Sequence, residues 1–225
     1  MIPIQTTSQV TVRISATSDR VRVTAEARDD VLVQGDASVR TNGSHTTVES
    51  RGDRILVRVP NGADLVIGTT SARVDVEGSA GRVAVVTESG RVTVEDATSV
   101  DIRTKSARVR VGRTSAECCV CTSSGRVTIG ECGSAEAATK SGRIVVHAAN
   151  GSVRAHCVSG RVEVGLMAPG DIDAETVSGE IRITVPAGVG VLTNDDSSVR
   201  TLWPDGAEAS VNARTVSGRV DVSST

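Results

Sequence analysis

The chain has 225 residues, a net charge of −2, no tyrosine, no phenylalanine and one tryptophan, Trp203, against 38 valines. The near-zero net charge gives no support to bulk electrostatic binding, and we expect no nucleic-acid partner. A compact globule of this length fills its centre with aromatic and leucine side chains, so the composition excludes such a core. The interior must be thin enough for valine and alanine to fill it, as in repeat proteins.

The start of the chain, MIPIQTTSQVTVRISATSDR, lacks a basic segment followed by an apolar run, and no stretch of about eighteen apolar residues occurs later. We therefore expect no secretory signal and no membrane span. The five cysteines are odd in number and cluster between residues 118 and 157, which fits a reducing compartment better than a disulfide framework. The expected location is cytoplasmic, or the cell surface if a signal has been removed from the sequence.

Residues 1–70 carry apolar pulses every eight to ten residues, which include Val10, Val21, Val31 and Val39. We interpret this region as the less regular N-terminal coils of a single domain that spans residues 1–225. The alternating segment QVTVRI, at residues 9 to 14, has no cap before it. We therefore expect an open strand edge at the N-terminal end.

A repeated motif, of which TKSGRIVV at residues 139 to 146 is one copy, dominates the rest of the chain. Its serine recurs at spacings of 17 to 19 residues, and a gap of 39 residues before the last copy spans two units. We therefore predict regular repeats over residues 71–194, and an irregular loop with a terminal coil over residues 195–225. The motif serines are Ser71, Ser89, Ser106, Ser124, Ser141, Ser159, Ser178 and Ser217.

Two apolar pairs alternate within each unit. One pair follows the serine, as Val92 and Val94 do, and the other precedes the next serine, as Val100 and Ile102 do. Alternation with period two indicates strands with one buried face. The unit predicts an all-β fold, a single-stranded parallel β-helix (β-solenoid) of about 18 residues per coil, right-handed as parallel crossovers favour. An antiparallel sandwich shares the alternation, but it does not require the same residue at the same place in every other strand.

The threonine, serine and glycine of the motif reverse the in–out phase between the two valine pairs, so they mark a corner. Small residues allow a tight turn, and stacked hydroxyls can satisfy polar groups that the turn frees. We interpret this part of the motif as structural.

An arginine stands two residues after the serine in nearly every unit, and only Glu180 interrupts the series. In a solenoid these side chains form one outward column, and like charges stacked at strand spacing are unfavourable. One interpretation is an anion-binding stripe for a polymer that carries phosphate or carboxylate, since the arginine fork engages both groups. The other is a solvated face on which nearby acids such as Asp75 and Glu163 offset the charge. The candidate anion-binding residues are Arg73, Arg91, Arg108, Arg126, Arg143 and Arg161.

Cysteine and histidine give no convincing site. Cys119 and Cys121 point outward on one predicted strand and could offer two thiolates to a metal, but no second CxxC or paired histidine completes a tetrahedral set. The three histidines lie in unrelated contexts without a nucleophile motif. We therefore expect no catalytic residue, no metal and no cofactor.

The C-terminal segment VSGRVDVSST is a full-strength repeat with no proline or charge cluster after it. An open solenoid edge recruits other strands unless it is blunted. We predict self-association, most simply as a homodimer, with Val220 and Val222 in the contact. The alternative is a monomer in which the irregular stretch DDSSVRTLWPDGAEAS, which carries Trp203, shields the last coil.

The stretch VRVPNGADLVIGTTSARVDVEG (57 to 78), followed by the SGRV repeats, resembles a bacterial family of β-strand-repeat domains of unknown function whose members are called adhesins. The resemblance implies a single-stranded, right-handed β-helix and brings no catalytic or ligand residues. We expect a non-enzymatic scaffold or interaction module with an unknown protein or polyanionic partner. The alternative is a binding protein or enzyme that acts on an anionic polysaccharide or another polyanion along the arginine column.

Overall fold

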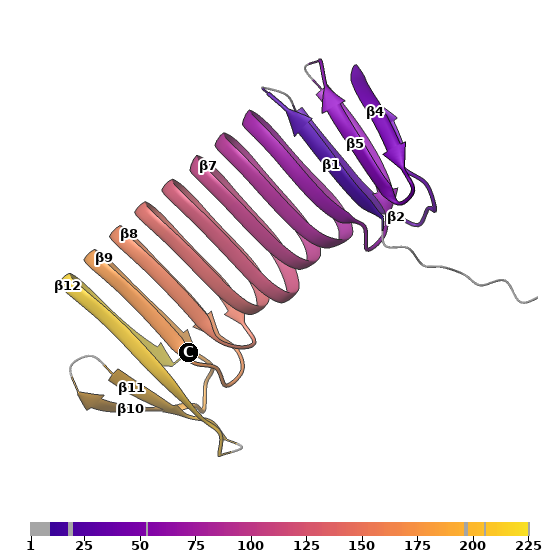
Figure 1. The fold of residues 1–225 in the computed structure, drawn as a ribbon. Helices are drawn as coiled ribbons and strands as arrows, with labels where there is room; N and C mark the ends of the chain where they lie inside the picture. The colour runs from indigo at the N-terminus through magenta and orange to yellow at the C-terminus, as the bar shows by residue number, and fades with distance from the viewer. Residues whose placement is uncertain (1–9, 18–19, 53, 196–197, 205, 225) are drawn as a thin grey trace, which may run out of the picture.

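The computed structural model describes residues 10–17, 20–52, 54–195, 198–204 and 206–224, and every regular element in them is a β-strand. The strands stack side by side into an elongated solenoid, with the N-terminal strands at one end and the C-terminal strands at the other (Figure 1). The strands are β1 (Thr11–Ala16), β2 (Arg20–Glu26), β3 (Leu32–Gln34), β4 (Ala37–Asn42), β5 (His45–Ser50), β6 (Arg54–Pro60), β7 (Asp64–Ala149), β8 (Val153–Leu166), β9 (Ile172–Val185), β10 (Gly190–Asp195), β11 (Ser198–Leu202) and β12 (Glu208–Ser224).

The repeats stack in the register that the serine spacing predicts. β8 pairs in parallel with β7 so that Ser159 lies opposite Ser141, and β9 pairs with β8 so that Ser178 lies opposite Ser159. β12 continues the ladder with Ser217 opposite Ser178. β7 winds through several coils as one continuous strand (Figure 1). The predicted all-β solenoid is confirmed, and its right hand stays a prediction.

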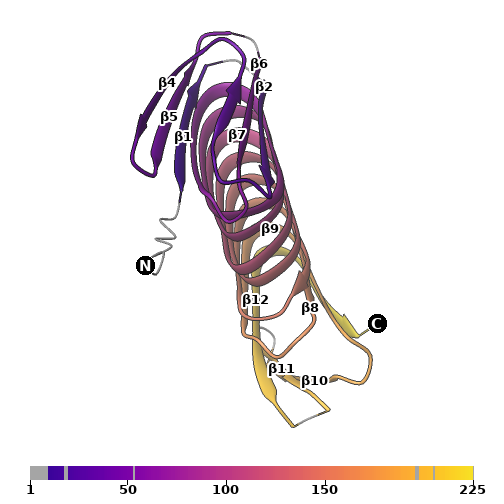
Figure 2. The ribbon, with the colours of Figure 1, turned by 90° about the vertical axis from the view of Figure 1, so that its right-hand side faces the viewer.

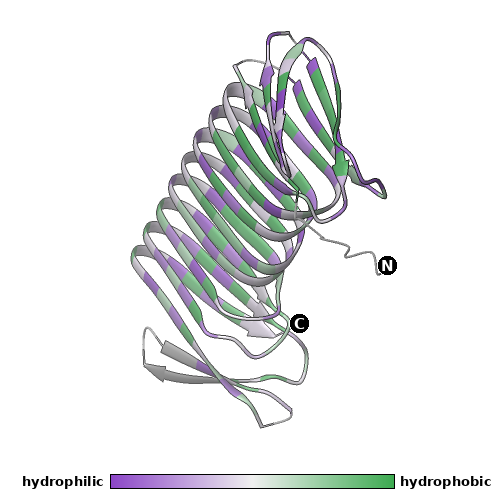
Figure 3. Cartoon of the chain, turned by 45° about the vertical axis from the view of Figure 1, so that its right-hand side comes forward, coloured by the Kyte–Doolittle hydropathy of each residue, from purple (hydrophilic) through white to green (hydrophobic). Residues whose placement is uncertain are grey.

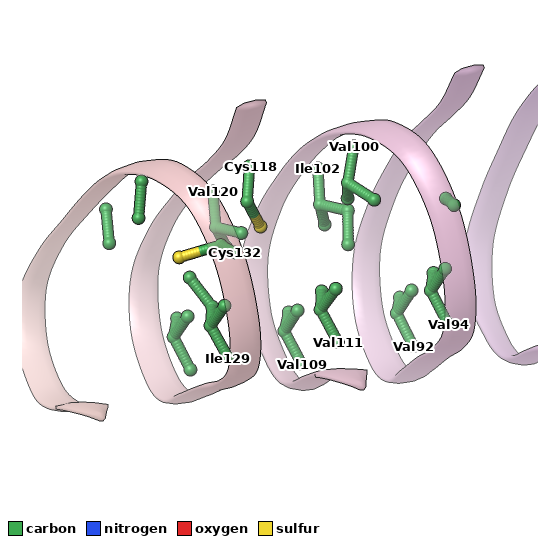
Figure 4. Packing of buried hydrophobic residues seen from close by; sticks show 14 of the residues in the cluster. Val92, Val94, Val100, Ile102, Val109, Val111, Cys118, Val120, Ile129 and Cys132 are labelled. Carbon is green, nitrogen blue, oxygen red and sulfur yellow. The ribbon is translucent and has the colours of Figure 1, made fainter. Parts of the chain in front are cut away.

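The core is a narrow column of inward valine, isoleucine and alanine side chains. Along the coils, apolar and polar residues alternate as stripes in Figure 3. Val92, Val94, Val100 and Ile102 are all at least 98% buried, and Figure 4 shows them pointing into the interior from both walls of the coils. Burying one such side chain contributes roughly 1.5–3 kcal/mol, so the regular stacking of small apolar residues replaces an aromatic core.

The N-terminal coils are not stacked in chain order. β1, which contains most of QVTVRI, lies between β5 and β7 and pairs in parallel with both. β2 likewise lies between β6 and β7. The coil formed by β5 and β6 is therefore outside the first coil of the sequence, and β4 and β3 cover it with antiparallel pairing. The expectation of an open edge at QVTVRI is wrong, because a later segment folds back over it (Figure 2).

The C-terminal end is covered over half of the last coil. β11 pairs antiparallel with Glu208–Asn212 of β12, and β10 pairs antiparallel with β11. Trp203, just after β11, is only 8% exposed and packs into the core cluster. The irregular stretch thus shields the first half of β12, whereas Val220 and Val222 in its second half remain half-buried.

Candidate functional site

The predicted arginines form a column on the outer face of the strand that follows each glycine corner. In the parallel ladders Arg143 lies opposite Arg161, and Arg161 lies opposite Glu180. The column ends at Arg219, which lies opposite Glu180 on the other side. Residues about eighteen apart in sequence are thereby brought within one strand spacing, about 4.8 Å, of one another.

Two arginines that the sequence analysis missed extend this column at its N-terminal end. Arg20 lies opposite Arg73, and Arg54 lies opposite Arg20. The sequence TSDRV, residues 17 to 21, keeps the serine, arginine and valine of the motif but has aspartate in place of glycine. That spacing was the signal that could have identified Arg20.

Ion pairs neutralise the column at two places. Arg73 Nε donates to the largely buried Asp75, with 2.9 Å between Nε and Oδ2. Further along, Arg161 Nε lies 2.9 Å from Glu180 Oε2, and the other oxygen of Glu180 accepts a hydrogen bond of 2.9 Å from Arg182 Nη2. Glu180 is therefore held by two arginines, one on the preceding coil and one on its own strand.

Between these places the arginines of the described column have no close carboxylate partner. Within the residues that the structure describes, no ion pair is formed by the central arginines, which are Arg91, Arg108, Arg126 and Arg143. The next outward residue on each of these strands is not acidic. These four neighbours are Thr93, Arg110, Thr128 and Val145. Four successive coils thus present arginine without a carboxylate beside it on the same strand.

A groove of about 750 Å³ runs beside the column. Arg108, Arg126 and Arg143 line it together with the corner glycines, and Glu180 lies at one end. The glycines are required by close packing, because a Cβ atom on Gly160 would meet the carbonyl oxygen of the preceding coil. The groove therefore has backbone where other positions carry side chains. Arg91 lies in an adjoining hollow of about 560 Å³ that Arg108 also lines, together with the acidic residues Asp75, Glu77 and Glu95.

The family model described as Toastrack DUF4097 matches residues 2–224. The chain belongs to this family. The resemblance to a β-strand-repeat family of unknown function is thereby confirmed. Among solved structures the chain is similar to a "putative adhesin" from Bacteroides fragilis, at 12% identity over 96% of this chain and 93% of that one, with a TM-score of 0.44. It is also similar to a "putative cell adhesion protein" from Clostridium sporogenes, at 9% identity over the same shares, with a TM-score of 0.30. No curated protein matches the chain.

Threonine hydroxyls close some corners of this Toastrack domain, whereas among the described residues the buried hydroxyls of Thr176 and Thr215 have no hydrogen-bond partner. Thr87 Oγ1 donates to the carbonyl oxygen of Ser89 at 2.9 Å, and Thr122 Oγ1 donates to that of Ser124 at 3.0 Å. Each bond closes the corner two residues before the arginine of the same coil. The threonines are therefore structural, and they help to fix the direction in which the arginine leaves the strand. In the described part of the Toastrack chain, no helix is long and apolar enough to cross a membrane.

The five cysteines of the Toastrack domain are free thiols. Cys118 and Cys132 are fully buried, and burial raises the pKa of Cys118 to about 12 and that of Cys132 to about 11. Cys119 and Cys121 are half-buried on the outer face. Across the described ranges, no group of three or more histidine, cysteine or acidic residues is arranged to hold a metal ion.

The raised thiol pKa values predict loss of stability at alkaline pH. A thiol whose pKa is higher in the folded state stabilises that state fully below its unfolded pKa of 9.0, and this contribution is lost as the pH rises toward 11 and 12. For each proton that the folded state binds in excess of the unfolded state, the free energy of unfolding falls by about 1.4 kcal/mol per pH unit. We expect the free energy of unfolding, measured with urea, to fall as the pH is raised from 8 to 10.5.

The chain has no tyrosine and only two lysines, so the remaining thiols are the main background: the pKa of Cys119 is also raised to about 11, and that of Cys157 is raised, both chiefly by burial. Replacing Cys118 by valine, the residue type that fills many other inward positions, should make the decline with pH shallower. An identical decline in the wild-type and Cys118→Val proteins would show that this thiol is not responsible.

Proposed function

We propose that this Toastrack domain is a non-enzymatic interaction module that binds a linear polyanion along the groove beside the central arginines. The observation that carries the proposal is the run of four arginines on successive coils without an ion pair in the described residues, bounded by the neutralised Arg73 and Arg161. Acids accompany the column at both ends of the run and are missing from its middle. This distribution fits a binding surface of limited length.

Stacked arginines at about 4.8 Å repel one another, and a bound chain of anions removes this repulsion. The guanidinium group binds carboxylate and phosphate through two parallel hydrogen bonds, so both kinds of polymer suit the column. Four arginines on successive coils cover roughly 14 Å, which is the length of three strand spacings. The glycine corners leave room for the backbone of a polymer beside the arginine side chains.

The groove is better suited to binding than to catalysis. Glu180 is the carboxylate among the described residues that line it, and two arginines hold this group in ion pairs. General acid–base cleavage needs a carboxyl or imidazole that is free to transfer a proton at the scissile bond. Single-stranded nucleic acid is disfavoured, because Trp203, the sole aromatic residue, is buried in the core and gives no stacking platform.

Binding can be measured by isothermal titration with polygalacturonate and with linear polyphosphate, and neutral dextran serves as the polymer control. We expect salt-sensitive binding to one or both polyanions. The triple variant Arg108→Gln, Arg126→Gln, Arg143→Gln should bind about 10- to 100-fold more weakly, since exposed charge pairs contribute up to about 1 kcal/mol each.

A matched variant separates this site from general charge. Arg40, Arg154 and Arg214 are exposed arginines outside the groove, and their replacement by glutamine removes the same three charges. This control should retain most of the affinity. Equal losses in the two triple variants would show that net charge, and not the groove, determines binding. Depolymerisation of either polyanion during the titration would instead favour an enzyme.

A further inference from the structure

The second half of the last coil presents a strand edge to solvent. Thr215–Ser224 pairs with β9 on one side, and in the part of the chain that the structure describes no strand pairs with its other side. Val220 and Val222 lie opposite Ile181 and Ile183. The two isoleucines are fully buried, whereas the two valines are only half-buried. The last coil therefore lacks the neighbour that every regular coil before it has. Figure 1 shows β12 at this end of the stack.

The charges on this edge are also unmatched. Arg219 lies beside Glu180, but Glu180 is already engaged by Arg161 and Arg182 at 2.9 Å each. Asp221 lies beside Arg182, whose guanidinium is directed to Glu180. Among the described residues neither Arg219 nor Asp221 has an ion-pair partner. Two opposite charges, two residues apart, are thus available on one outward face.

These charges specify one kind of neighbour. A further parallel coil in the same register would place arginine beside arginine and aspartate beside aspartate, which is destabilising. An antiparallel second copy centred on Val220 places Arg219 of each chain opposite Asp221 of the other. The same arrangement puts Val220 opposite itself, and Val222 opposite Gly218 of the other chain, which leaves room for the valine side chain. The edge is therefore complementary to itself.

We infer that two copies of this chain associate through the edge of residues 217–224, by antiparallel pairing about a two-fold axis at Val220. This closed dimer uses each open edge once, so it does not extend into a fibre. β11 and β10 project beyond the last coil on the opposite wall, so the two solenoids meet at an angle. The interface is separate from the groove, and its test uses no polyanion.

Sedimentation velocity over a wide range of protein concentration tests the pairing through two single substitutions. Arg219→Asp leaves two acids on the edge, and Asp221→Arg leaves two arginines. In a dimer of either variant, residues 219 and 221 of opposite chains therefore carry the same charge at both contacts. We expect the wild-type chain to form dimers and each variant to dimerise at least about tenfold more weakly, since like charges opposite each other are destabilising. An equimolar mixture of the two variants should form a heterodimer, because both opposed pairs are then of opposite charge.

The mixture also controls for folding, since a misfolded variant could not regain association by mixing. The double variant Arg219→Asp, Asp221→Arg restores both intermolecular pairs but sets like charges beside Glu180 and Arg182 of β9, so it should dimerise more tightly than either single variant. A wild-type chain that stays monomeric at all concentrations overturns the inference. Dimers that neither single substitution weakens place the interface elsewhere, and weakened variants that do not combine exclude the antiparallel register.

Discussion

Replacing Gly160 by alanine is expected to lower the free energy of unfolding by about 3 kcal/mol. Gly160 has a φ of 148°, in a region that L-residues rarely adopt, and an added Cβ would lie far inside contact distance of the carbonyl oxygen of Gly142. The unfavourable backbone contributes roughly 1–3 kcal/mol and the overpacking of a close-packed site roughly 1–3 kcal/mol. Urea unfolding followed by circular dichroism measures the loss.

Gly43→Ala is the matched control for this experiment. Gly43 also has a positive φ, 59°, but apart from its own residue and its two chain neighbours no atom lies within 4 Å of the Cβ that alanine would add. This variant should lose about 1 kcal/mol, which is the backbone contribution alone. If both variants lost the same amount, the close approach of successive coils at the corner would not be what selects glycine.

Two corners of the regular coils carry alanine in place of the motif glycine. Ala72 and Ala107 occupy the position of glycine in their coils, and no residue other than glycine has a positive φ in the described chain. Their corners therefore follow a different backbone path. The sequence motif predicts the corner in either case, but it does not reveal which path the chain takes.

The regular coils could be predicted because each one repeats the same short pattern of apolar and polar residues. Ile144 lies opposite Val162, and Val162 lies opposite Ile181, so the alternation in one unit matches that of its neighbours without a shift. A slip of one residue would turn every valine outward. Burial of the valines thus determines the pairing register, and the fixed period determines which residue of the next coil is the partner.

The N-terminal order could not be predicted in this way. The alternating pattern of β1 indicates which of its side chains are buried, but it fits β5 and β7 equally well as neighbours. The choice depends on the antiparallel strands β3 and β4, which cover the far side of the β5–β6 coil. The pairing of these strands depends on contacts between residues far apart in the sequence, which the repeat pattern does not predict.

The sequence predicted the arginine column, but it did not show which of these arginines form ion pairs. The neighbour of Arg73 is Asp75, two residues along the same strand, so that pair could be anticipated from spacing. Glu180 instead reaches Arg161 on the preceding coil and Arg182 on its own strand. Which arginines remain unpaired depends on these side-chain directions, and the candidate site follows from them.

Val146→Asp is expected to destabilise the fold even more than Gly160→Ala does. Val146 is 1% exposed, faces the core and lies opposite Val164 of the next coil. An aspartate there would be an uncompensated buried charge, which costs about 3–5 kcal/mol, or would have to take up a proton. A domain of ordinary stability has only about 5–15 kcal/mol in total. We expect the variant to be largely unfolded in mild urea, as measured by circular dichroism.

Val145→Asp is the same substitution one residue earlier, on the outer face, where Val145 is half-buried. It places a carboxylate two residues after Arg143, the spacing at which Asp75 pairs with Arg73 at 2.9 Å. The free energy of unfolding should change by less than about 1 kcal/mol, because a surface ion pair with Arg143 is offset by Glu163, which lies opposite residue 145 on the next coil. The new carboxylate would neutralise one of the four central arginines, so this folded variant should also bind polyphosphate more weakly. A folded Val145→Asp protein with unchanged polyanion affinity would count against the groove as the binding site.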